Sequence, residues 1–158
     1  RCRRLAFPPL SLEETAAFVR DREDVSVEDS LRLAKMSGGA PGRAWALAGA
    51  KALDMDDAAR ALIEELPRVD EAMALSLADR FRGAEGRAQF NLLFDRLAER
   101  VHGFATDRAG QGIGGLDRWA QVWETLEQLS RDVEALNLDR ADALFTALGE
   151  LRQAARAA

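Results

Sequence analysis

Residues 37–48 of the chain read Ser-Gly-Gly-Ala-Pro-Gly-Arg-Ala-Trp-Ala-Leu-Ala, a pattern that predicts a tight turn between two helices. Gly38 and Gly39 are suited to end the first helix, because glycine adopts a left-handed backbone conformation without a steric penalty. Pro41 is suited to begin the second helix, where the N–H group that proline lacks has no partner within the helix. Gly42 completes a turn that is built almost entirely of small residues.

Arg43 projects from the first turn of the second helix in this interpretation. Ala44, Trp45 and Ala48 recur at helical spacing and predict the apolar stripe of that helix. Two interpretations of the arginine stay open from its chemistry alone. It either belongs to an ordinary joint between helices, or its guanidinium is directed across a domain boundary at an anionic group.

The composition favours helices over strands. The chain of 158 residues contains 30 Ala and 22 Leu, but only 7 Val, 2 Ile, 4 Thr and no Tyr. Alanine and leucine are strong helix formers, whereas β-branched and aromatic residues are enriched in strands. We therefore predict an all-α protein that is large enough to bury a core.

Capping residues and apolar periodicity place the individual helices. Ser11-Leu-Glu-Glu14 and Ser26-Val-Glu-Asp29 have the form of capping boxes, in which a hydroxyl and a carboxylate satisfy free N–H groups at a helix start. These two boxes open the first two helices. The later helices are expected at about 41–50, 55–66 and 70–82, and in three long segments around 90–104, 116–133 and 141–151.

The helices divide into two parts at the polar stretch 51–57. Residues 1–52 are expected to form a bundle of three short helices, with Val27, Leu31 and Ala34 facing inward, and residues 53–158 a bundle of about five helices. The first bundle has few large apolar side chains, so we expect it to unfold more easily than the second. Three apolar seams are expected in the second bundle: Phe90, Leu93, Phe94, Leu97, Val101 and Phe104; Leu116, Trp119, Trp123, Leu126 and Val133; and Ala141, Leu144, Phe145, Leu148 and Leu151. Asn137 and Asp139 offer caps between the last two helices.

Charge and cysteine content exclude several classes of protein. The formal net charge of −5 argues against a nonspecific surface for nucleic acid or anionic membranes, which needs a basic excess. The single cysteine, Cys2, excludes an internal disulfide and fits a reducing compartment. The chain has no apolar run of 18 residues. We expect a cytoplasmic protein without a membrane partner.

No constellation of residues predicts a catalytic centre, a metal site or a cofactor site. The only histidine, His102, has no Cys, Asp or Glu at a metal-ligand spacing. Gly-Gln-Gly-Ile-Gly-Gly at 110–115 matches G-x-G-x-x-G, but it follows a helix rather than a strand, so it predicts a loop between helices. No P-loop is present, and we expect the chain alone to bind neither ATP nor double-stranded DNA.

The chain resembles one family at several points. Arg1-Cys2-Arg3, followed by Leu5, Phe7 and Pro9, is similar to the end of the Ser-Arg-Cys motif of clamp-loader AAA+ subunits and to the exit from that motif into the helical lid. Residues 37–47 resemble the G-x-P-G-R-A-x-x-L segment at the third lid helix. The segments 116–120 (Leu-Asp-Arg-Trp-Ala) and 136–140 (Leu-Asn-Leu-Asp-Arg) resemble the collar of delta-prime subunits of the bacterial DNA polymerase III clamp loader.

The resemblance implies a three-helix AAA+ lid in 1–52 and an oligomerising collar in 53–158. Arg1 then matches the arginine finger that such subunits present in trans to the ATP site of a neighbour, and Arg43 matches the sensor arginine of the lid. Gly38, Gly39, Pro41 and Gly42 form the lid turn. The chain begins without methionine, and we expect it to be a fragment that follows an N-terminal nucleotide-binding domain.

The implied role is that of a structural subunit of a bacterial replication machine. Its partners would be gamma/tau-type and delta-type subunits, with ATP bound by the neighbours and with primer-template DNA and the sliding clamp met only through the whole complex. Trp119, Trp123 and Leu129 spread over more than one stripe of their helix and are candidates for the assembly surface, although burial in the core is the alternative for each. A different function also stays open, that of a free-standing helical adaptor that binds a partner helix.

Overall fold

The computed structural model describes residues 8–83, 85–110 and 115–157. Over these residues the chain is all-α, as predicted, with no strand and with eight helices. The helices are α1 (Leu12–Arg20), α2 (Val27–Ser37), α3 (Pro41–Gly49), α4 (Ala52–Glu64), α5 (Glu71–Arg80), α6 (Gly86–Gly110), α7 (Leu116–Leu136) and α8 (Arg140–Ala157). None of the helices in the described ranges is long and apolar enough to cross a membrane.

The chain forms two compact units, Arg1–Asp54 and Met55–Ala158. The boundary falls inside the first turn of α4, which begins three residues earlier than the expected start at Met55. Lys51 explains the difference, because its positive φ of 54° turns the chain sharply and lets a new helix begin directly afterwards. Ala52 and Met55 are both buried in this turn of α4.

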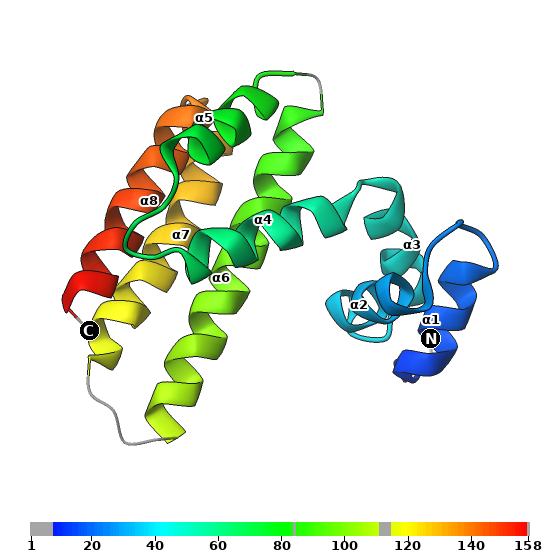
Figure 1. Ribbon diagram of the computed structural model, residues 1–158. Coiled ribbons are helices and arrows are strands. Elements are labelled where there is room, and N and C mark those ends of the chain that lie inside the picture. The colour runs from blue at the N-terminus through cyan, green and yellow to red at the C-terminus, as the bar shows by residue number, and fades with distance from the viewer. Residues whose placement is uncertain (1–7, 84, 111–114, 158) are drawn as a thin grey trace, which may run out of the picture. The chain divides into compact units, whose positions relative to one another are not determined.

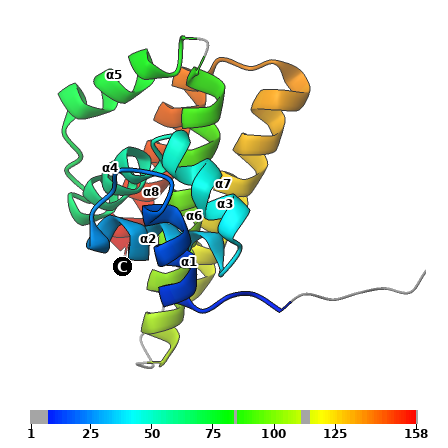
Figure 2. The same cartoon turned by 90° about the vertical axis from the view of Figure 1, so that its right-hand side faces the viewer.

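In the first unit, α1, α2 and α3 pack against one another (Figures 1 and 2). The capping box of α1 is confirmed: the Glu14 N–H donates to Ser11 Oγ over 3.1 Å, and the Ser11 N–H donates to Glu14 Oε2 over 2.9 Å. At α2 the Asp29 N–H donates to Ser26 Oγ, but the shorter Asp29 carboxylate accepts the Ser26 hydroxyl instead of the backbone N–H of the cap. Both serines therefore begin their helices as expected.

The inward face predicted for α2 is partly wrong. Val27 is 63% exposed and Leu31 is also exposed, and of the three expected residues only Ala34 is buried. The face that is buried consists of Ser30, Leu33, Ala34 and Ser37. Two serines can lie there because their hydroxyl groups donate to backbone carbonyls of the same helix, at Val27 and Ala34. This side-chain bonding makes serine compatible with a buried helical face.

In the second unit, α6, α7 and α8 run side by side, and α5 packs against α8 (Figure 1). The Phe90 ring lies 5.5 Å from that of Phe81 and 4.2 Å from that of Phe94, between ring centroids. Arg100 of α6 donates to the Asp56 carboxylate of α4 over 2.7 Å and so ties α4 to the long helices. The Asp139 carboxylate accepts the N–H groups of Ala141 and Asp142, which confirms the expected cap of α8.

Three residues of the expected seams lie at the surface, and Phe104 of α6, which is 38% exposed, is one of them. Trp123 of α7 is 39% exposed, and Val122 takes the buried position beside it. Phe145 of α8 is 41% exposed, and the adjacent Leu144 is fully buried. A helix turns by 100° per residue, so neighbouring apolar residues point in different directions, and the packing of the neighbouring helices decides which one is covered.

The first unit should lose its structure more readily than the second. Its described core contains only three apolar side chains larger than alanine, Val19, Leu33 and Leu47. The core of the second unit contains three phenylalanines and many leucines. Hydrogen exchange on the intact chain should therefore show faster opening of the amides of α1–α3 than of α6–α8. Equal protection in both units would contradict this expectation.

Acid should weaken the start of α1. The Ser11 backbone N–H, and after it the Ser11 hydroxyl, hold the pKa of the Glu14 carboxyl below its ordinary value. A carboxyl whose pKa is lower in the folded state stabilises that state above its unfolded pKa, and this stabilisation is lost as the pH falls through the ordinary glutamate range of about 4.3 and below. Glu14→Gln should remove this part of the pH dependence of α1 amide exchange. Glu13→Gln removes a charge from the same turn but leaves the capping box intact, so it should retain that part.

Candidate functional site

The turn between α2 and α3 is the best-defined candidate site in the first unit. Gly38 ends α2 in the left-handed conformation with φ 62°, and Gly39 follows with φ 79°, so the predicted helix end is confirmed. The Gly38 N–H donates to the Ala34 and Lys35 carbonyls, which satisfies the end of α2. Pro41 is in the first turn of α3, as expected.

A contact with an earlier segment holds this turn. The Leu10 N–H donates to the Gly39 carbonyl over 2.9 Å. A Cβ atom at Gly39 would lie 2.4 Å from the Leu10 carbonyl oxygen, so the two backbone segments approach more closely than a side chain permits. The left-handed conformation of Gly39 was predictable from the sequence, but the contact with Leu10 was not.

Arg43 lies at the exposed start of α3. The residue before the helix, Ala40, provides no side-chain cap, so the first N–H groups of α3 are not satisfied by such a cap. Within the described residues, Arg43 has no hydrogen bond and no ion pair. An accessible guanidinium next to an uncapped helix N-terminus forms a local positive potential that suits an anionic group.

The apolar stripe predicted for α3 needs correction. Ala44 and Leu47 are buried, whereas Trp45 is 49% exposed. The Trp45 indole Nε1–H donates to the Glu23 carboxylate over 2.6 Å. The indole therefore bridges α3 to the connection between α1 and α2 instead of filling the core.

No family model, no curated protein and no solved structure matches this chain.

The three candidate assembly residues have different positions in α7. Trp119 is only 4% exposed and belongs to the core of the second unit, so it is not part of a surface. Leu129 is partly buried and packs against the same core. Trp123 alone presents a large apolar area to solvent, with its ring centroid 6.3 Å from that of His102.

Two sequence expectations concern residues that lie outside the described ranges. Arg1, the candidate arginine finger, and Cys2 precede residue 8. Most of the glycine-rich segment 110–115 also lies outside, but Gly115 is described and precedes α7 with φ 86°. Among the residues that the structure describes, no group of three or more His, Cys, Asp or Glu side chains is placed to hold a metal ion.

Replacing Gly39 should damage the turn. Gly39→Ala would place a methyl group against the Leu10 backbone at a φ that side chains rarely adopt, and we expect it to destabilise the first unit by about 1–3 kcal/mol. Gly49→Ala in α3 is the matched control, because a Cβ there meets no atom within 4 Å. The control should be neutral or stabilising by up to about 1 kcal/mol. Amide protection of α1–α3 measures both, and equal effects would show that the contact with Leu10 is unimportant.

Proposed function

We propose that this chain is the lid and collar part of a clamp-loader subunit of the delta-prime type. The observation that carries the proposal is the presentation of Arg43. The turn that resembles the G-x-P-G-R segment of the lid leaves this guanidinium exposed at an uncapped helix start, with no hydrogen bond or ion pair to any described residue. A guanidinium in this position can contact an anion outside the unit.

Two kinds of anion suit Arg43 in this role. A phosphate of a nucleotide would accept hydrogen bonds from the guanidinium and from the first N–H groups of α3. A carboxylate of an adjacent domain would make the same contacts. Contact with a phosphate is consistent with a lid that senses a bound nucleotide. Contact with a carboxylate is consistent with a lid that packs against a nucleotide-binding domain.

The second unit supplies the collar in this proposal. Large apolar side chains are exposed on its last two helices, namely Trp123, Leu136 and Phe145. Exposed apolar area of this kind is typical of a surface that a partner covers. The partners would be gamma/tau-type and delta-type subunits. Arg1 would act on the ATP of a neighbouring subunit, and DNA and the sliding clamp would be reached only through the whole complex in the bacterial cytoplasm.

The assembly surface centres on Trp123 rather than on Leu129. Leu129→Arg would place a charge against the core of the second unit, so a loss of binding could reflect unfolding alone. Trp123→Arg changes an exposed side chain and leaves the core intact. This makes Trp123 the sharper position for a test of assembly.

Trp123→Arg should weaken assembly with gamma/tau-type and delta-type subunits by about tenfold or more, as is common for an aromatic residue in the centre of an interface. Far-UV circular dichroism and the melting temperature should stay nearly unchanged. Leu75→Arg is the control, because Leu75 is also exposed but lies on α5. Quantitative co-purification with the companion subunits measures both variants.

Two results would contradict the proposal. One is a failure of the unmodified chain to join the companion subunits. The other is equal binding by the unmodified chain and by Trp123→Arg. If the chain instead bound an isolated amphipathic helix through Trp123 and joined no ring, the adaptor function would replace the clamp-loader function.

A further inference from the structure

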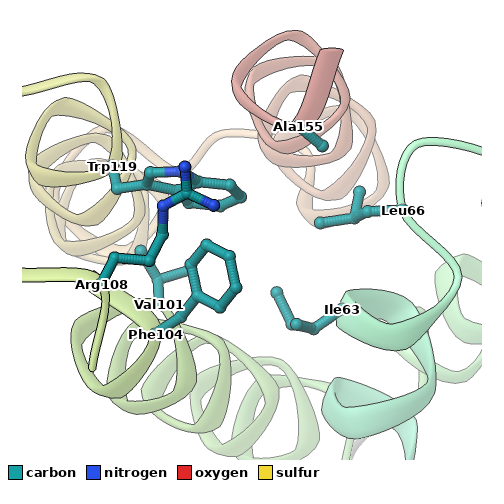
Figure 3. A pocket seen from close by; sticks show the side chains of 7 residues that line it. All are labelled: Ile63, Leu66, Val101, Phe104, Arg108, Trp119 and Ala155. Carbon is teal, nitrogen blue, oxygen red and sulfur yellow. The ribbon is translucent and has the colours of Figure 1, made fainter. Parts of the chain in front are cut away.

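A cavity of about 280 Å³ lies in the second unit. Helices α4, α6, α7 and α8 and the residues that follow α4 contribute its walls (Figure 3). The described residues that line it are Ile63, Leu66, Val101, Phe104, Arg108, Trp119 and Ala155. Phe104 is also 38% exposed, so the cavity can be reached from solvent beside this ring. Cavities between the helices of a bundle are common sites for small molecules.

The size and the lining of the cavity suit an apolar molecule of about ten non-hydrogen atoms. The Phe104 and Trp119 rings lie with their centroids 4.7 Å apart, and Figure 3 shows Ile63, Leu66 and Ala155 across from them. A dry cavity of about 150 Å³ with leucine, isoleucine and phenylalanine walls binds benzene, which has six carbon atoms. In the same proportion, a cavity of 280 Å³ holds about eleven non-hydrogen atoms. The aliphatic and aromatic walls therefore leave room for a substituted benzene ring.

The charged side chain at the cavity does not call for an anion. The Arg108 guanidinium carbon lies 5.4 Å from the Phe104 centroid, and Arg108 also has a further interaction within the chain. An anionic molecule would lose its hydration on entering the cavity, and its charge would have to compete with the interactions that Arg108 already makes. Burial of a charge without full compensation is costly, so the cavity favours a neutral molecule.

The Trp119 indole N–H lacks an acceptor. Trp119 is 4% exposed, and within the described part of the chain its Nε1 has no hydrogen-bond partner. A buried donor without an acceptor is unfavourable, and the indole N–H is usually bonded when it is buried. Neighbouring atoms cover Nε1, so an acceptor in the cavity reaches it through a rotamer change of an adjacent side chain, which is fast where the side chain is partly exposed. A molecule with one acceptor would satisfy this donor.

We propose that this cavity binds a small neutral molecule with an apolar, aromatic body and one hydrogen-bond acceptor. The acceptor bonds to the Trp119 indole N–H, and the body lies against Ile63, Leu66 and Ala155. The hydrogen bond orients the molecule, while burial of its apolar surface supplies most of the affinity. Acetophenone, a benzene ring that carries one carbonyl group, has this size and this chemistry and serves as the probe.

The Trp119 indole N–H reports binding at the cavity itself. Its NMR signal can be assigned by elimination with Trp45→Phe and Trp123→Phe, because both of these tryptophans are exposed. Titration of the intact chain with acetophenone should shift the Trp119 signal in a saturable manner, with a Kd below about 1 mM. The signals of Trp45 and Trp123 should stay in place. The absence of a saturable Trp119 shift up to about 10 mM acetophenone would overturn the proposal.

Two compounds of the same shape test the neutral charge and the acceptor separately. Benzoate replaces the methyl group of acetophenone by a charged oxygen and should bind at least about tenfold more weakly. In α-methylstyrene a CH₂ group replaces the carbonyl oxygen. At saturation, acetophenone should move the indole proton to a higher chemical shift than α-methylstyrene does, because only acetophenone accepts its hydrogen bond. Binding of benzoate as tight as that of acetophenone, or equal indole shifts with the two neutral compounds, would contradict the proposal.

Variants of α8 show whether the bound molecule occupies the cavity. Ala155→Leu should fill part of the cavity and lower acetophenone affinity at least about tenfold. Ala155→Val adds less volume and should lower it severalfold, so it replaces the leucine variant if that variant fails to fold. Gln153→Leu is the matched control, because it adds a leucine at an exposed position of the same helix and should bind as the unmodified chain does. Unchanged affinity in a folded Ala155 variant would place the molecule elsewhere and overturn the proposal.

Discussion

Burial of the apolar face of α6 is the interaction on which the second unit depends. This helix of 25 residues places Phe90, Phe94, Leu97 and Val101 at successive turns, and all four are buried. Burial of one such side chain stabilises a fold by about 1.5–3 kcal/mol, so this face alone contributes more than any cap or ion pair in the unit. Helices α7 and α8 extend the same core, and polar contacts such as Arg100 to Asp56 determine where α4 attaches.

The first unit depends more on local backbone chemistry. Its core is small, and its helices are defined by caps at Ser11 and Ser26 and by the glycine turn at Gly38 and Gly39. Capping contacts are typically worth about 1 kcal/mol each, which is a substantial fraction of the stability of a small bundle. The turn is also the feature that presents Arg43, so one of the elements that define this unit lies in the same short segment as its candidate functional residue.

The proposed clamp-loader role depends on exposed groups, Arg43 in one unit and Trp123 in the other. The guanidinium of Arg43 lies in solvent at a helix start, where an anion would complete its interactions. Trp123 of α7 exposes its large apolar side chain to solvent.

Features that depend on near neighbours along the chain could be predicted from the amino-acid sequence. Helical class, the caps at Ser11 and Asp139, the glycine end of α2 and the position of Pro41 were all predictable, because each arises from contacts within a few residues. Which apolar residue of a neighbouring pair is buried depends on how the helices pack against one another. Packing buries Val122 and Leu144 and leaves Trp123, Phe145 and Val27 exposed. Helix packing also buries Arg96, whose guanidinium pairs with Glu99, although a charged residue on a helix is usually exposed to solvent. The contact of Leu10 with Gly39 and the cavity beside Trp119 could not be predicted either, because segments distant in the sequence create both of them.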